Sequence, residues 1–281
     1  MKRIFPQFFR SSLSTASLAT ASLATASLAT AFVLSSLASQ GFAQAPAAPA
    51  APAAAQAAAP KANPTTTPAP RNDQWWQNRH ASMNKRVAEG KVDLLFIGDS
   101  ITQGWEGAGK KVWEQRFAPR NAVNLGIGGD RTQHVLWRLE NGNIAGIEPK
   151  LAVLMIGTNN SGSDSSEAIA EGVKAIVEKL KTSLPKTKIL ILAIFPRGAT
   201  PDTPGRKVNE GANAIIAKLA DGERVEFLDI GPKFLEADGT LSKEIMPDLL
   251  HLNEKSYGIW ADAIEPQLTK VYGPLPEAPK P

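Results

Sequence analysis

Serine, histidine and aspartate occur in this sequence at positions where they could carry out acyl transfer. Ser100 follows the apolar run of residues 92–97 through a Gly-Asp pair, a pattern that indicates a buried parallel strand ending in a sharp turn. Open α/β sheets bind ligands beyond the carboxyl ends of their strands, so Ser100 lies where a nucleophile is expected. The alternative is that Ser100 simply caps a helix.

Two further strand ends carry groups that could stabilise a developing oxyanion. Residues 126–130 form a glycine-rich turn with backbone N–H groups, and Asn159 follows the expected strand 151–156. The carboxyl ends of parallel strands lie at one edge of the sheet. We therefore expect Ser100, Gly129 and Asn159 to converge, as acyl transfer requires.

The general base must come from three histidines. His251 follows Asp248 in an Asp-x-x-His pattern, so the carboxylate can hold one ring nitrogen and leave the other for the serine. Such a pair is also common where aspartate caps a short loop, and this interpretation stays open. His134 lies inside the next helix and is a candidate substrate contact, whereas His80 is expected to be structural or solvent-facing.

Five short apolar segments alternate with amphipathic helical patterns along residues 72–274. The expected strands are 92–97, 122–125, 151–156, 189–194 and 225–228. The expected helices are an opening one around 75–87, a short one near Trp113, and then 132–139, 165–184, 206–219 and 254–271. This alternation predicts a single three-layer α/β/α domain with a five-stranded parallel sheet in flavodoxin-like order.

The first 71 residues differ in composition from the rest. A start with Lys2, Arg3 and Arg10 precedes residues 11–60, which carry no charge, and this predicts a signal peptide over residues 1–43. An uncleaved membrane anchor is the alternative, which the serine and threonine content disfavours. Residues 44–71, rich in Ala and Pro, predict a disordered tether, and 275–281 a disordered tail. We expect a periplasmic or extracellular protein with no stable membrane span after cleavage.

Composition disfavours several other functions. The net charge of +4 is small and the lysines are scattered, so no nucleic-acid-binding surface is predicted. With no cysteine and three dispersed histidines, we expect no disulfide, no metal site and no cofactor. The glycine patterns at 104–111 and 126–131 each lack a residue that phosphate-binding loops or dinucleotide fingerprints require.

Aromatic and acidic residues near the expected site are candidate substrate contacts. Trp105, in the loop after Ser100, is the best of six tryptophans, although tryptophans at helical spacing more often pack in a core. Asp99 and Asp130, beside the two turns, are further candidates. The other five tryptophans are Trp75, Trp76, Trp113, Trp137 and Trp260.

Four blocks in chain order resemble those of the GDSL/SGNH hydrolase superfamily. They are Gly98-Asp99-Ser100, Gly126-Ile127-Gly128-Gly129-Asp130, Gly157-Thr158-Asn159-Asn160 and Asp248-Leu249-Leu250-His251. Residues 129–142 are also similar to the intracellular platelet-activating-factor acetylhydrolase catalytic subunits. The likeness covers about residues 75–272.

This resemblance implies the SGNH hydrolase fold and ester hydrolysis without a metal, through an acyl-enzyme. Ser100 would be the nucleophile, His251 the general base and Asp248 the residue that orients it. The N–H groups of Ser100 and Gly129 and the side-chain amide of Asn159 would form the oxyanion hole. The resemblance also suggests a homodimer.

We therefore expect an exported serine esterase that hydrolyses short-chain esters, acetyl above all, of carbohydrates or lipids. A lysophospholipase or a thioesterase would use the same site. A catalytically silent carbohydrate-binding module is the alternative from another class, and the presence of every expected catalytic residue disfavours it.

Overall fold

One sheet of five parallel strands organises the part of the chain that the structure, a computed structural model, describes: residues 63–275. Its order is β2-β1-β3-β4-β5, so the predicted flavodoxin-like order is confirmed. The strands are β1 (Leu94–Gly98), β2 (Ala122–Gly126), β3 (Leu151–Met155), β4 (Lys188–Leu192) and β5 (Val225–Leu228). All five were predicted, and their ends differ from the expected ones by two residues at most. The expected signal peptide and residues 44–62 of the expected tether lie outside the described residues.

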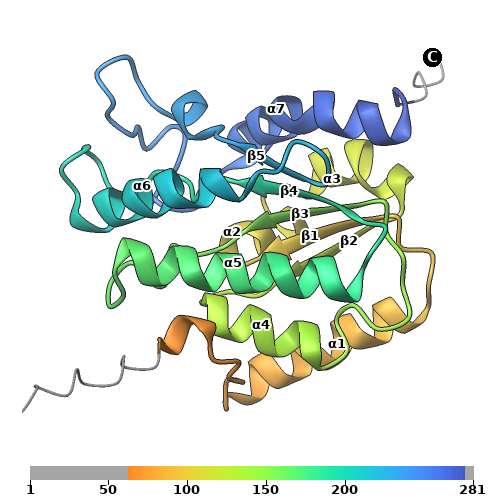
Figure 1. The fold of residues 1–281 in the computed structure, drawn as a ribbon. Helices are drawn as coiled ribbons and strands as arrows, with labels where there is room; N and C mark the ends of the chain where they lie inside the picture. The colour runs from red at the N-terminus through yellow and green to blue at the C-terminus, as the bar shows by residue number, and fades with distance from the viewer. Residues whose placement is uncertain (1–62, 276–281) are drawn as a thin grey trace, which may run out of the picture. The chain divides into compact units, whose positions relative to one another are not determined.

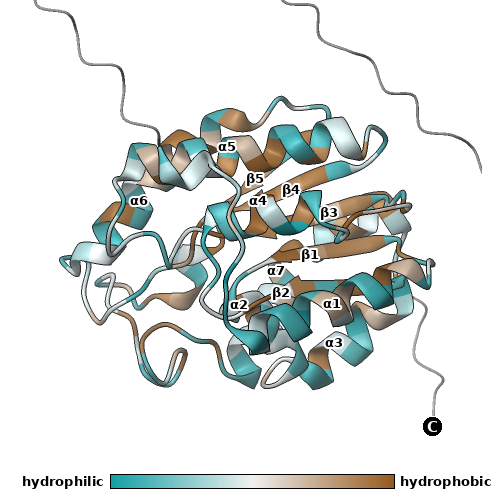
Figure 2. Cartoon of the chain, turned by 90° about the horizontal axis from the view of Figure 1, so that it is seen from below, coloured by the Kyte–Doolittle hydropathy of each residue, from teal (hydrophilic) through white to brown (hydrophobic). Residues whose placement is uncertain are grey.

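Helices cover both faces of the sheet, which confirms the three-layer prediction (Figure 1). One face packs against α1 (Gln74–Ala88), α4 (Thr132–Glu140), α5 (Ser166–Ser183) and α6 (Pro204–Ile216). The other packs against α3 (Lys110–Arg116) and α7 (Glu254–Tyr272). Leu95 and Phe96 illustrate the consequence, since they point to opposite faces and both are fully buried. Burial on both sides explains why the central strands β1 and β3 carry no polar side chain, and Figure 2 shows both in brown.

The three longest helices begin where a polar side chain accepts a hydrogen bond from the backbone N–H three residues further on. These caps are Asp73 for α1, Ser165 for α5 and Asn253 for α7. Each satisfies an N–H group that the helix leaves without a partner. The caps fix the helix starts, and in α1 the start also places the two adjacent tryptophans Trp75 and Trp76.

Residues 63–71 pack on the domain, although their composition predicts part of a disordered tether. The 3₁₀ turn η1 (Pro64–Thr66) places Thr65 in the interior, where it is wholly buried. Thr65 Oγ1 donates to the carbonyl of Ala168 at 2.5 Å, and its own carbonyl accepts from Thr132 Oγ1 at 2.9 Å. The tether prediction is therefore wrong for residues 63–71. Buried hydrogen bonds offset the entropy of ordering the segment, and composition does not reveal them.

An aromatic cluster fills the layer between β1 and α7. Trp105 lies at its centre with 1% of its surface exposed, and its ring centroid is 4.5 Å from that of Tyr257 and 4.9 Å from that of Trp260. The prediction that Trp105 contacts substrate is wrong. The 3₁₀ turn η2 (Gly104–Glu106) follows the serine and carries the indole under the sheet instead of onto its rim.

Replacing Trp105 by alanine is expected to lower the free energy of unfolding by about 3–5 kcal/mol, because it empties a large volume inside a packed cluster. Urea denaturation measures this. Trp75→Ala is the matched control, since the Trp75 side chain is 50% exposed. This substitution should change the free energy of unfolding by no more than about 0.5 kcal/mol. Equal losses in the two variants would contradict the buried position of Trp105.

Candidate active site

Three strands end at one edge of the sheet in the segments that the sequence singles out. β1 is followed by Ser100, β2 by the turn that contains Gly129, and β3 by Asn159. β1 lies between β2 and β3, so the strand order reverses at this point, and such switch points form the ligand crevices of α/β sheets. The ends of β1 and β3 are so close that a Cβ at Gly98 would lie 2.4 Å from the carbonyl oxygen of Met155.

Ser100 is the first residue of α2 (Ser100–Gln103), and the cap of this short helix is Asp99. The Asp99 Oδ1 accepts a hydrogen bond from the Ile101 N–H at 3.0 Å. The interpretation of Ser100 as a helix cap is therefore wrong. Asp99 caps the helix, and the serine hydroxyl is free to bond to another partner.

Ser100, His251 and Asp248 form a continuous chain of hydrogen bonds. The Ser100 Oγ lies 2.8 Å from His251 Nε2, and His251 Nδ1 lies 2.6 Å from Asp248 Oδ2. A carboxylate only accepts, so Nδ1 carries the hydrogen and Nε2 accepts from the serine. Burial acts to raise the pKa of Asp248, but hydrogen bonds from the ring and backbone of His251 outweigh it and lower that pKa.

The two oxygens of Asp248 perform separate tasks. While Oδ2 holds the imidazole, Oδ1 accepts from the backbone N–H of His251 at 2.7 Å and of Leu250 at 3.1 Å. Leu249, which follows Asp248, has a left-handed φ of 62°, a conformation that a bulky residue rarely adopts. The loop-capping interpretation and the imidazole-orienting interpretation of Asp-x-x-His therefore both hold, on different atoms.

Three N–H donors lie at the strand ends near the serine. Neither the Ser100 N–H nor the Gly129 N–H donates to an acceptor within residues 63–275. The Asn159 Nδ2 donates to the carbonyl of Asp130 at 2.9 Å, and an amide nitrogen has a second hydrogen to offer. Gly129 has a φ of 77°, a left-handed conformation that glycine adopts readily.

Gln103 and Arg71 fix the glycine-rich turn, and the sequence analysis missed both. The Gly128 N–H donates to Gln103 Oε1 at 2.7 Å, and the Gly128 carbonyl accepts from Arg71 Nη1 at 2.6 Å. A Cβ on Gly128 would lie 3.7 Å from the Ser100 Cβ, so the turn rests against the serine. Only the position of Gln103, three residues after Ser100 in the same helix, gave a sequence signal for this role.

Asp130 is buried with Arg138 behind the turn, so its predicted role as a substrate contact is wrong. Both side chains have no exposed surface, and Arg138 Nε donates to Asp130 Oδ2 at 2.8 Å. The other carboxylate oxygen accepts from Trp76 Nε1 at 2.7 Å, and Arg138 Nη2 donates to the Gly98 carbonyl at 3.3 Å. The sequence held one signal: Arg138 lies on the apolar stripe of α4, three residues after Val135, where a charge requires a buried partner.

Asp99, the third predicted contact, is also fully buried, and this prediction is wrong as well. Its Oδ2 has no hydrogen-bond partner among the described residues, and burial raises the pKa of the carboxyl to about 7. The position directly before the serine suggested access to substrate, but α2 turns the aspartate inward as its cap.

His134 has a role in helix capping. Its Nδ1 accepts from the Arg131 N–H at 3.1 Å, which requires a ring without a hydrogen on that nitrogen. Burial, and then the charges of Arg71 and Arg131, lower the pKa of His134 to about 4, so it is neutral at pH 7. Its side chain is 16% exposed, and contact with substrate stays a prediction.

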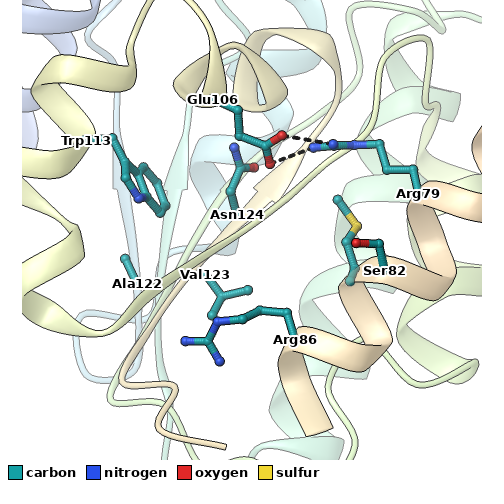
Figure 3. Close-up of a pocket in the computed structure, with 9 residues that line it drawn as sticks. Arg79, Ser82, Arg86, Glu106, Trp113, Ala122, Val123 and Asn124 are labelled. Atoms are coloured by element: carbon teal, nitrogen blue, oxygen red, sulfur yellow. Dashed lines mark hydrogen bonds and ion pairs between the residues drawn. The ribbon is translucent and has the colours of Figure 1, made fainter. Parts of the chain in front are cut away.

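A cavity of about 320 Å³ lies along the outer edge of β2 and does not include Ser100 (Figure 3). The ion pair of Arg79 and Glu106 borders it, with an N–O distance of 2.8 Å. Arg79 Nε also donates to the Gly126 carbonyl at 2.8 Å, so the cavity wall supports the start of the glycine-rich turn. Within residues 63–275, no group of three or more His, Asp or Glu side chains is placed to hold a metal ion.

Comparisons with known proteins agree with this fold and site. Residues 96–259 match the profile of the GDSL-like lipase/acylhydrolase family. The human platelet-activating factor acetylhydrolase IB subunit alpha1 is 41% identical over 200 residues, which cover 69% of this chain and 85% of that protein. The rat alpha2 subunit is 37% identical over 201 residues, covering 70% and 85%. A GDSL-like lipase structure from Bacteroides thetaiotaomicron has a TM-score of 0.54 at 20% identity, covering 69% of this chain and 97% of that one.

A three-layer α/β/α domain in which a serine, a histidine and an aspartate are linked at the switch point of the sheet defines a serine hydrolase. The chain belongs to the GDSL-like lipase/acylhydrolase family, and it is a serine ester hydrolase. The resemblance found in the four sequence blocks is thereby confirmed.

Asp99 should make stability depend on pH in a defined direction. Its folded pKa of about 7 lies above the unfolded value of about 3.9, so the native state binds the additional proton between these values, and stability falls as pH rises through this range. Asn cannot ionise, yet it keeps an oxygen to cap Ile101. The stability of Asp99→Asn relative to the wild type should therefore increase from pH 4 to pH 8, measured by urea denaturation. A difference that stays constant over this range would show that Asp99 ionises normally.

Proposed function

We propose that the protein is an exported esterase that hydrolyses short acyl esters, acetyl above all, with Ser100 as nucleophile. The observation that carries this proposal is the chain of hydrogen bonds from Ser100 Oγ through the His251 ring to Asp248, at 2.8 and 2.6 Å. These distances lie within the reach that proton transfer between a nucleophile and its base requires.

In the acylation step, Ser100 Oγ attacks the ester carbonyl carbon while His251 Nε2 takes the hydroxyl proton. Asp248 keeps the ring in the required tautomer and stabilises the imidazolium that forms. Collapse of the tetrahedral intermediate breaks the bond to the alcohol, which leaves with the proton from His251. In deacylation, His251 Nε2 takes a proton from water as the water attacks the acyl carbon. Collapse of the second intermediate breaks the bond to Ser100 Oγ, which regains the proton from His251, and the carboxylic acid leaves.

The negative charge on the tetrahedral intermediate needs donors that are already in place. We assign this role to the N–H groups of Ser100 and Gly129 and to the Asn159 side chain. The hydrogen bond from Asn159 to the Asp130 carbonyl holds the amide in one orientation before substrate arrives. Such preorganisation makes the donors effective, because they do not reorganise during the reaction.

A short acyl group is supported by the relatives. The human and rat proteins that share 37–41% identity with this chain are named acetylhydrolases, and the chain covers 85% of each. The proposal covers both carbohydrate esters and lipid esters, since the same triad would hydrolyse either.

The N-terminal sequence supports export. Basic residues at positions 2, 3 and 10, followed by an uncharged stretch to residue 60, fit a cleaved signal peptide. No helix among residues 63–275 has the length and apolar content that a membrane crossing requires. Protein recovered from the periplasm or medium should begin at Gln44, which N-terminal sequencing would establish. Mature protein in the cytoplasm that begins at Met1 would contradict export.

A homodimer is a further part of the proposal, supported only by the sequence resemblance. Light scattering on the purified protein would measure its mass in solution. A mass equal to one chain would exclude the homodimer without affecting the proposed chemistry.

Substitutions at Ser100 and Asn159 test the assigned roles on a series of p-nitrophenyl acyl esters. The wild type should hydrolyse acetate fastest, and Ser100→Ala should lower kcat by more than about 1,000-fold. Asn159→Ala should lower kcat by about 100- to 1,000-fold with little change in KM, because the lost donor acts on the oxyanion. Asn72→Ala, an exposed asparagine, is the control and should match the wild type.

Two results would contradict the proposal. A folded wild type that hydrolyses no ester would remove Ser100 as a general esterase nucleophile. A preference that increases with acyl length would replace the acetylesterase by a lipase-like activity at the same site.

A further inference from the structure

Trp75 is the one large apolar side chain that the described residues expose, with 50% of its surface accessible. It lies in the first turn of α1, two residues after the capping residue Asp73. Its neighbour Trp76 is fully buried, so the indole of Trp75 is not needed for the core. An exposed indole beside a reaction site is a typical contact for a ligand.

The indole lies next to the proposed nucleophile. A Cβ built on Gly128 would lie 3.7 Å from the Trp75 Cη2 and also 3.7 Å from the Ser100 Cβ, so the ring and the serine flank the same point. The Gly128 peptide between them is held on both sides by Gln103 and Arg71. The indole and the serine therefore both lie against the same fixed piece of backbone.

Polar groups lie against the same turn as the indole. The Arg71 guanidinium is 25% exposed and approaches to 3.1 Å from a Cβ position on Gly129, and Gln103 Oε1 approaches to 3.2 Å from that on Gly128. The guanidinium has more N–H donors than its bonds to Asp73 and Gly128 use. The rim thus combines one flat apolar face with hydrogen-bonding groups.

This combination fits a sugar ring better than a lipid. A pyranose has an apolar face of C–H groups, which packs on an indole, and hydroxyls at its edge, which need donors and acceptors. A long acyl chain would need a continuous apolar surface, whereas one isolated indole ring is exposed here. A cationic headgroup would lie close to the Arg71 guanidinium, which disfavours it.

We propose that Trp75, with Arg71, forms a subsite for the sugar ring that carries the ester, and that the substrates are O-acetylated carbohydrates. This inference rests on the proposed esterase function of Ser100. Trp75 binds the sugar and sets specificity, and it takes no part in the bond-breaking steps.

The test compares an acetylated xylo-oligosaccharide with p-nitrophenyl acetate, which lacks a sugar. For Trp75→Ala, the ratio of kcat/KM on the oligosaccharide to kcat/KM on p-nitrophenyl acetate should fall about 3- to 10-fold, mainly through KM. Trp75→Tyr should restore most of this ratio, because it returns an aromatic face. Gln74→Ala, an exposed neighbour on α1, is the matched control and should keep the wild-type ratio.

A binding measurement separates this inference from the esterase proposal. Xylotriose without acetyl groups should change the tryptophan fluorescence of Ser100→Ala, and the additional Trp75→Ala substitution should abolish the change. This readout does not depend on hydrolysis. It tests the subsite even if the wild type hydrolyses neither ester, a result that would remove the esterase function.

Three results would overturn the subsite. One is an unchanged activity ratio in Trp75→Ala on a wild-type background that hydrolyses both esters. Another is the absence of any fluorescence change with xylotriose. A third is a selective loss on a 2-acetyl phospholipid instead of on the oligosaccharide, which would assign Trp75 to a lipid substrate.

Discussion

A buried ion pair between Asp130 and Arg138 holds the segments of the site in their relative positions. Arg138 reaches the Gly98 carbonyl at the end of β1, and the Asp130 carbonyl accepts from Asn159 after β3. A buried ion pair needs hydrogen bonds to its remaining polar atoms, and here Trp76 Nε1 donates to the second carboxylate oxygen of Asp130. The serine strand, the glycine-rich turn and the amide are therefore linked through one network that has little freedom to adjust.

The rest of the sheet supplies rigidity, and the polar groups of the site lie at its carboxyl edge. Strands apolar on both faces form a packed interior between two helical layers. At the edge, small residues let the segments approach: a Cβ at Gly126 would lie 2.3 Å from the backbone nitrogen of Gln103. Glycine there keeps α2 directly against β2, and this contact brings the turn to Ser100.

The elements and the Asp248–His251 pair could be predicted from sequence because they follow from local rules, whereas the link from His251 to Ser100 rested on the family resemblance. Periodicity located every strand, and the spacing of Asp248 and His251 within one loop limited how the two could pair. The orientation of single residues could not be predicted. Trp105 turns inward because of one 3₁₀ turn, while Trp75 is left exposed although its neighbour Trp76 is buried. Arg71 and Thr65 were missed because their partners lie more than fifty residues away, where composition carries no information.

The separation of the serine from its histidine along the chain has a consequence for biosynthesis. The two residues lie 151 positions apart, one after the first strand and the other after the last. Between them the chain must complete four further strands and dock the loop that precedes α7. A nascent chain that has emerged from the ribosome only as far as β1 and Ser100 is therefore not yet a hydrolase. Cleavage of esters begins only when almost the whole domain has been synthesised, so no shorter nascent chain can act on acylated molecules near the site of translation.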